Sequence, residues 1–184
     1  SNVGTPTDWT NDSSSIAIPG AGRIQSVFKS NDRLITTKNS GLMFQWNGGV
    51  LADLATKLGP TSPASIGETE DYRFWLNRLG IFGYGGERPE LLSNAIEKQI
   101  YNDANEGIIG TTFDNAQGAV HNYDYFLSIG TVTDDLTDET IANAIVKYDY
   151  QLNDFVDYSF SNRPTAWLSY KDNIGNQQLI FGDA

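Results

Sequence analysis

The sequence predicts an all-β protein, a β-propeller-like stack of about four antiparallel blades with one short helix. Short apolar or aromatic segments alternate with turn residues along most of the chain, which is typical of short strands. The 184 residues include 18 Gly, four Trp, nine Tyr and nine Phe, a composition that suits tight turns between packed sheets. The pattern also repeats after about 40 residues, a period at which propeller units of several strands recur.

The repeat is clearest in residues 62–93, SPASIGETEDYRFWLNRLGIFGYGGERPELLS. This segment has a short extended opening at 65–67, an aromatic strand at 72–76 and a second strand at 80–84. Residues 88–91 then lead out of the unit. The preceding segment has the same order: Ser-apolar, a polar turn with Asp, an apolar strand, Gly-apolar-apolar, an aromatic and a glycine turn. We therefore expect each unit to form one up-and-down sheet.

Extended to the whole chain, the pattern predicts one domain over residues 1–184. Its candidate blades are residues 23–58, 62–93, 108–160 and 164–184. The last unit lacks strands, so we expect the chain to be a fragment of a larger propeller. A capping-box spacing from Asn94 to Glu97 predicts a short helix over 94–101.

Three local features complete the prediction. Asn47-Gly48, after the alternating strand 42–46, is a strong hairpin signal. Leu51, Leu54 and Leu58 fit either a short helical turn or an outer strand. A turn at Gly118 is expected before the aromatic strand 123–130.

Charge and composition limit the function. The formal net charge of −11 argues against binding nucleic acid or an anionic membrane through a basic face. The chain has no Cys and one His, so a zinc-type metal site is not expected. No cofactor is predicted either. No apolar run reaches the roughly 18 residues of a membrane span.

The acidic stretch TVTDDLTDET is the candidate interaction loop. It lacks the spaced carboxylates of a calcium loop, and charge runs of this kind usually mark an exposed hairpin tip. The residues that we expect to form this tip and to contact a partner are Asp134, Asp135, Asp138 and Glu139.

No catalytic motif is found, and we predict that the chain is not an enzyme. No motif places a Ser or Cys beside His121, so a surface or hydrogen-bonding role is favoured for it. Glu68, Glu70 and Asp71 cluster at a predicted turn, whereas a glycosidase needs two carboxyls held about 5–9 Å apart across a sugar. Residues 169–175 resemble a sialidase Asp box only faintly, with different spacing.

Aromatic side chains leave two interpretations open. They can stack on sugars, or they can fill the cores between blades, which is the usual role of alternating aromatics in strands. The second interpretation is favoured. The residues concerned are Trp46, Trp75, Tyr84, Tyr123 and Tyr125.

The runs GRIQSVFKSNDRLITTKNSGLMFQWNGG and SPASIGETEDYRFWLNRLGIFGYGGERPELLSNAIEKQIYN resemble propeller-like structural proteins of tailed bacteriophages. The resemblance covers residues 22–102 well and the remainder loosely, and its motifs carry no active site. It implies a virion component, such as a tail hub, adaptor or fibre-associated propeller, that docks on other virion proteins and forms a homo-oligomer within the particle.

The sequence thus predicts a non-enzymatic structural and interaction module of a virion. Two alternatives remain open: a carbohydrate- or receptor-binding module, for which a secreted location is also compatible, and a propeller glycosidase. Exposed Trp or Tyr platforms would favour the first alternative. Two inward-facing carboxylates near a channel would favour the second.

Overall fold

The computed structural model describes residues 17–96, 115–134, 139–159 and 162–183. These residues form four antiparallel sheets, three with four strands and one with two. They include two short 3-10 turns, and no helix among them is long and apolar enough to cross a membrane. The prediction of an all-β, propeller-like stack is confirmed.

The first sheet contains β1 (Ile24–Ser30), β2 (Arg33–Lys38), β3 (Met43–Trp46) and β4 (Leu51–Ala55), paired in chain order. The segment that fitted either a helical turn or a strand is therefore strand β4. At the predicted Asn47-Gly48 hairpin, the Asn47 Oδ1 atom accepts the main-chain N–H of Val50 at 3.0 Å, and Gly48 has a φ of 96°. This Asx-type turn sets the register of β3 and β4.

The second sheet contains β5 (Gly67–Glu68), β6 (Arg73–Asn77), β7 (Gly80–Tyr84) and β8 (Glu90–Leu91). It differs from the prediction at its start, because η2 (Pro63–Ser65) is a 3-10 turn and the strand begins only at Gly67. Proline at the first position favours such a turn, since its φ is already helical and it has no N–H to lose.

The helix predicted over 94–101, after the second sheet, also differs from the structure. The 3-10 turn η3 covers Ser93–Ile96, so it begins one residue before the expected Asn94 cap. The Ser93 hydroxyl accepts the main-chain N–H of Ile81 at 3.1 Å, and this contact ties the turn to β7. Residues 97–101 of the predicted helix lie outside the described residues.

The third sheet contains β9 (Gln117–His121), β10 (Asp124–Asp134), β11 (Glu139–Asp149) and β12 (Asp154–Ser159). The prediction of a turn at Gly118 was wrong, because Gly118 lies within β9 and the turn is formed by Asn122 and Tyr123, with φ of 51° and 71°. Glycine is needed at 118 for space: a Cβ atom there would collide with the Ser65 carbonyl oxygen.

The fourth sheet contains only β13 (Pro164–Lys171) and β14 (Gln177–Asp183). Its turn is closed by Asp172, whose Oδ1 accepts the main-chain N–H groups of Ile174 at 3.0 Å and Asn176 at 2.8 Å. Desolvation of Asp172 opposes its ionisation, but these N–H groups together with the side chains of Gln178 and Asn176 hold the carboxyl pKa below its ordinary value.

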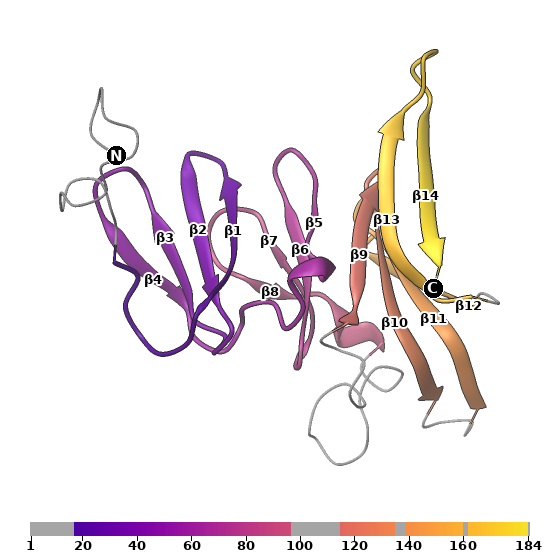
Figure 1. Cartoon of the computed structure of the whole chain (residues 1–184), viewed down its shortest axis with the longest axis horizontal. Helices are drawn as coiled ribbons and strands as arrows, with labels where there is room; N and C mark the ends of the chain where they lie inside the picture. Colours follow the sequence, from indigo (N-terminus) through magenta and orange to yellow (C-terminus); the bar gives the residue numbers. More distant parts are fainter. Residues whose placement is uncertain (1–16, 97–114, 135–138, 160–161, 184) are drawn as a thin grey trace.

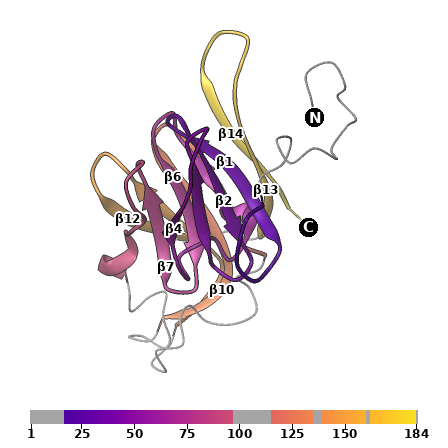
Figure 2. The same ribbon diagram turned by 90° about the vertical axis from the view of Figure 1, so that its left-hand side faces the viewer.

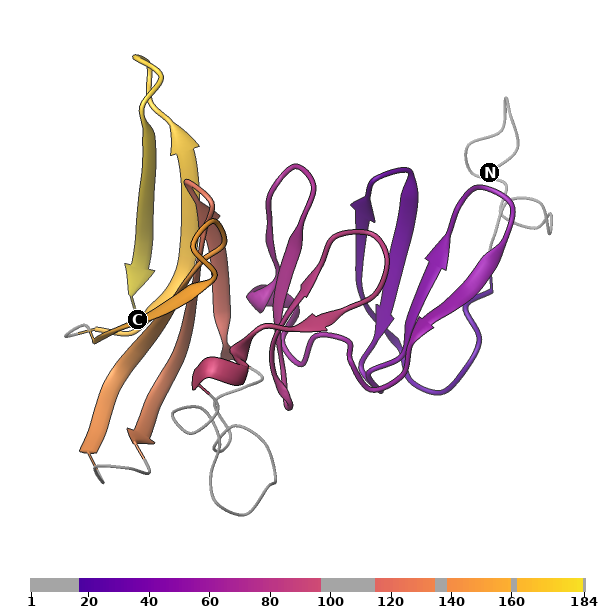
Figure 3. The same ribbon diagram turned by 180° about the vertical axis from the view of Figure 1, so that it is seen from behind.

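The four sheets stand side by side in chain order, from β1–β4 at one end of the row to β13–β14 at the other (Figure 1). The view from behind gives the same order, and the view from the first sheet shows the others behind it (Figures 2 and 3). Each sheet therefore packs on its neighbours through its faces, as the blades of a propeller do.

Two hydrophobic cores lie on the two faces of the second sheet. Neighbouring residues of β6 point to opposite faces, so Trp75 packs toward the first sheet while Phe74 and Leu76 pack toward the third. The core shared with the first sheet consists of Phe28, Ile35, Met43, Trp75, Phe82 and Tyr84. The core shared with the third sheet includes Phe74, Leu76, Ile81, Tyr125, Leu127, Val146 and Tyr148.

Candidate functional site

The fourth sheet is the candidate site, because one face packs on the third sheet at Trp167 while the apolar residues of the other face are exposed. Its inner face meets the third sheet through Trp167, whose ring lies 6.0 Å from that of Phe126 and 5.5 Å from that of Phe181 between centroids. Trp167 and Phe181 are direct cross-strand partners. The inner face thus belongs to the stack.

The outer face carries the residues that alternate with these. Leu168 pairs with Ile180 across the two strands, and Tyr170 lies two residues from Leu168 on the same face. Leu168 is 55% exposed, Ile180 49% and Tyr170 42%. Ala166 extends the same row and is also exposed. We call these four residues the outer face of the fourth sheet; a sheet face of this composition is normally buried.

Both strands of this sheet are edges, and β14 pairs only with β13 among the described residues. Residues 177–182, QQLIFG, carry no charge. Exposed edge strands are usually protected by charged side chains or Pro, because their free N–H and C=O groups can pair with another strand. β14 has neither device over this length, so both its edge and its outer face are suited to contact with another sheet.

The opposite end of the row is different. Residues 17–20 run beside the outer side of the first sheet, where the Lys38 ammonium donates to the carbonyl oxygens of Ile18 at 3.0 Å and Gly20 at 2.6 Å. Phe44 and Thr36 on that side are 4% and 5% exposed. The first sheet is therefore partly covered by its own chain, whereas the outer face of the fourth sheet is not.

His121 has neighbours that the sequence did not reveal. Its Nδ1 atom lies 3.3 Å from the Ser169 hydroxyl of β13, and its Nε2 atom lies 3.1 Å from the Asn122 amide nitrogen. Ser169 comes 48 residues later, so only the packing of β13 against β9 brings the pair together. The contact is exposed, and it joins the third and fourth sheets by a hydrogen bond.

The predicted acidic loop joins β10 to β11, where Asp134 and Glu139 are paired across the hairpin. Residues 135–138, which include Asp135 and Asp138, lie outside the described residues. Its role as a contact loop stays a prediction. In the described part of the chain, no three His, Cys, Asp or Glu side chains are grouped so that they could hold a metal ion.

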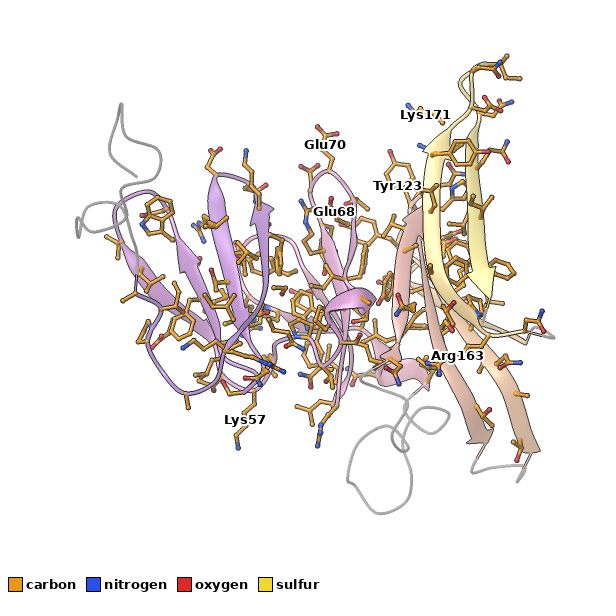
Figure 4. The ribbon with its side chains drawn as sticks, viewed as in Figure 1. Lys57, Glu68, Glu70, Tyr123, Arg163 and Lys171 are labelled. Atoms are coloured by element: carbon orange, nitrogen blue, oxygen red, sulfur yellow. The ribbon has the colours of Figure 1, made fainter. Side chains whose placement is uncertain are left out.

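The cluster of Glu68, Glu70 and Asp71 lies in the hairpin between β5 and β6, at the tip of the second sheet (Figure 4). All three residues are exposed. Glu68 forms an ion pair with Arg73, 3.2 Å from its Oε2 atom to the Arg73 Nε atom. The sequence placed these carboxylates at a turn; Glu70 and Asp71 lie there, and Glu68 is the last residue of β5 before it.

The five aromatic residues divide between the core and the surface. Trp75, Tyr84 and Tyr125 are fully buried, as the core interpretation expects. The Trp75 indole N–H donates to the Leu58 carbonyl oxygen at 2.8 Å, so the polar atom of this ring is also paired. Tyr123 is 57% exposed at the β9–β10 turn, and Trp46 is half-buried.

Comparisons with known proteins give structural likenesses only. No family model matches the chain. No curated protein matches it in sequence. The computationally designed Ika4 protein is similar in structure, with a TM-score of 0.47 and 11% identity over 89% of this chain and 93% of that one. BamB from Moraxella catarrhalis has a TM-score of 0.33 and 13% identity, and the match covers 85% of this chain and 63% of that one.

Proposed function

We propose that this chain is a non-enzymatic structural and interaction module that docks on a neighbouring protein through its fourth sheet. The observation that carries the proposal is the two-stranded sheet β13–β14, with an uncharged edge and an apolar outer face. Every other sheet has four strands. A partner that adds strands to β14 and lays an apolar sheet on the outer face would complete the row.

The internal contacts of the chain indicate the chemistry of this partner. The interface between the first and second sheets joins rings and aliphatic side chains face to face, as in Phe28 against Trp75 at 6.4 Å between centroids. Leu168, Tyr170 and Ile180 are side chains of the same kind. The partner expected is therefore another β-sheet with an apolar face, which adds to β14 through main-chain hydrogen bonds.

The setting that we propose is a virion, with the chain as a tail-associated component. This part of the proposal is supported by the resemblance of residues 22–102 to propeller-like structural proteins of tailed bacteriophages. The net charge of −11 is compatible with a particle surface. The acidic β10–β11 loop is a second candidate contact, at the far tip of the third sheet.

The first test is sedimentation of the native source material, with mass spectrometry of each fraction. We expect the chain to pellet with large particles in a fixed ratio to other proteins. A chain that stays at the top of the gradient as a free small protein would contradict the virion setting.

The second test places a charge on the outer face. Leu168→Lys should weaken docking by about 10-fold or more, since burying a Leu is worth about 1.5–3 kcal/mol and each 1.4 kcal/mol is a factor of ten. The change makes the net charge less negative, so added repulsion between acidic proteins cannot explain a loss. The matched control is Val50→Lys, at a residue 63% exposed in the β3–β4 turn.

Particles assembled with each variant would be compared by the amount of chain that co-sediments. If Leu168→Lys co-sediments like the wild type, the fourth sheet is not the docking surface. Sedimentation equilibrium of the purified wild-type chain identifies the partner: a monomer indicates a different protein, and a dimer sensitive to Leu168→Lys indicates a second copy.

A further inference from the structure

A broad hollow of about 1090 Å³ lies between the first and second sheets, at the edge of these sheets opposite the Glu68–Glu70 hairpin (Figure 4). Four segments form its walls: the start of β1, the β2–β3 turn at 39–41, the connection 57–63 and the β6–β7 turn at 77–79. This hollow is remote from the fourth sheet. Lys57 marks its position in Figure 4, where the side chain projects away from the sheets.

The charge of the hollow is opposite to that of the chain. Its lining includes Arg23, Lys57 and Arg78 and no Asp or Glu, although the whole chain has 23 acidic and 12 basic residues. The three basic residues are exposed. Among the described residues, the ion pairs join Arg73 to Glu68 and Lys147 to Asp124, so none of the three is neutralised by a salt bridge there.

Hydrogen bonds to main-chain carbonyl oxygens hold the walls of the hollow in place. Lys57 has a φ of 64°, a left-handed conformation that costs energy for a residue with a Cβ atom. The buried Asn77 amide stabilises it by donating to the carbonyl oxygens of Lys57 at 3.1 Å and Gly59 at 2.6 Å. The Gly59 N–H donates to the Gly41 carbonyl oxygen at 3.0 Å. The connection and both turns are thus fixed to one another before any ligand arrives.

Polar and apolar groups lie beside the three cations. Asn39 and Ser40 are exposed at the rim, and the Ser40 hydroxyl donates to the Ala21 carbonyl oxygen at 2.8 Å, which leaves its oxygen able to accept a further hydrogen bond. Leu79 is 47% exposed in the same lining. The hollow therefore offers positive charge, hydrogen-bonding groups for hydroxyls, and an apolar surface.

We propose that this hollow binds a short saccharide that carries carboxylate groups. Carboxylates would pair with Arg23, Lys57 and Arg78, hydroxyls with Asn39 and Ser40, and a C–H face of a sugar ring with Leu79. Three cations suit a ligand with more than one carboxylate better than a single inorganic anion. A long polyanion such as nucleic acid would be repelled by the net charge of −11 outside the hollow.

Calorimetric titration of the whole chain at low salt tests the proposal, with trigalacturonate as the probe. Maltotriose is the neutral saccharide of similar size, and inorganic phosphate is the free anion. We expect binding of trigalacturonate that weakens as salt rises, with much weaker binding of the other two. Lys57→Gln and Arg78→Gln should each weaken it about 10-fold, as loss of a charge-assisted hydrogen bond does.

The matched control is Lys171→Gln, which removes one positive charge from β13 at the far end of the row (Figure 4). It should bind trigalacturonate like the wild type, and thermal unfolding should show that all three variants are folded. Three results would overturn the proposal: no binding of trigalacturonate at millimolar concentration, equal binding of maltotriose or phosphate, or an equal loss in Lys171→Gln. None of them bears on docking through the fourth sheet.

Discussion

Tyr125 is a single residue on which the contact between the second and third sheets depends. It is fully buried, its ring stacks on Phe74 with centroids 5.2 Å apart, and its hydroxyl donates to the Ser65 carbonyl oxygen at 2.5 Å. Burial raises the pKa of the phenol well above its ordinary value. The hydroxyl is therefore kept neutral in the folded protein.

Tyr125→Phe should lower the free energy of unfolding by about 1–3 kcal/mol, because it leaves the buried Ser65 carbonyl oxygen without this donor. Urea unfolding followed by circular dichroism measures the change. Tyr123→Phe is the control, since Tyr123 is 57% exposed and a surface change of this kind stays within about 0.5 kcal/mol. An equal decrease in the free energy of unfolding in both variants would show that the hydrogen bond from Tyr125 to Ser65 does not stabilise the fold.

The pH dependence of the same pair gives an independent check. The unfolded chain ionises Tyr near pH 10, whereas Tyr125 in the folded chain ionises only at higher pH. Its contribution is therefore fully present below about pH 10 and is lost as pH rises above that value. Tyr125→Phe should flatten the loss of stability above pH 10, and an unchanged slope would contradict the assignment.

The sequence predicted the contacts of a residue well where they lie within one turn, and poorly where they depend on the packing of distant segments. Asn47-Gly48 forms the predicted hairpin because its hydrogen bonds lie within the turn. The contact of His121 with Ser169 had no signal in the sequence, since it exists only where β13 packs on β9. The basic hollow was missed for the same reason: Arg23, Lys57 and Arg78 are far apart in the chain.

At the level of elements, the close approach of β9 to the 3-10 turn η2 joins the third sheet to the second. Gly118 lies against Ser65, where an added Cβ atom would meet the main-chain carbonyl oxygen and the ring of Tyr125. Gly67 of β5 faces the same ring, with Tyr125 Cδ2 2.8 Å from where its Cβ would lie. Two glycines thus let two sheets come together around one aromatic side chain.

Gly118→Ala should therefore destabilise the chain by about 1–3 kcal/mol, because the main chain of Ser65 must move to admit the methyl group. Gly49→Ala is the matched control: it lies in the β3–β4 turn with no atom within 4 Å of the added Cβ. Thermal unfolding of the two variants measures the difference. A Gly118→Ala variant as stable as Gly49→Ala would show that the two sheets are not tightly apposed at this point.

The elements also show why strands were easier to predict than their ends. The alternation of β6 and β7 is strong, and β7 covers Gly80–Tyr84 as predicted. The opening at 65–67, by contrast, was expected to be extended, yet Ser65 belongs to the 3-10 turn η2, in which its hydroxyl donates to the Ser62 carbonyl oxygen at 2.7 Å. A local hydrogen bond of this kind competes with strand pairing and is not visible in an apolar-polar pattern.

For the molecule as a whole, the second sheet is the shared layer between the two cores. All residues of β6 and β7 are buried, with Trp75 in the core shared with the first sheet and Leu76 in the core shared with the third. Because the main contacts between sheets in the described part of the chain join neighbours in the row, stability should be close to a sum of sheet and interface terms, as in repeat proteins. A core mutation should then destabilise the sheets that share that core more than the sheets farther along the row.

Leu127→Ala and Met43→Ala test this range, since both residues are fully buried but lie in different cores. Each change should cost about 2–5 kcal/mol. In native-state hydrogen exchange, Leu127→Ala should speed exchange in the second and third sheets more than in β1–β4, and Met43→Ala should do so in the first and second sheets more than in β9–β12. If both variants speed exchange equally in all sheets, the row unfolds as one cooperative unit, and completion of the fourth sheet by a partner would then stabilise the entire chain and not the third and fourth sheets alone.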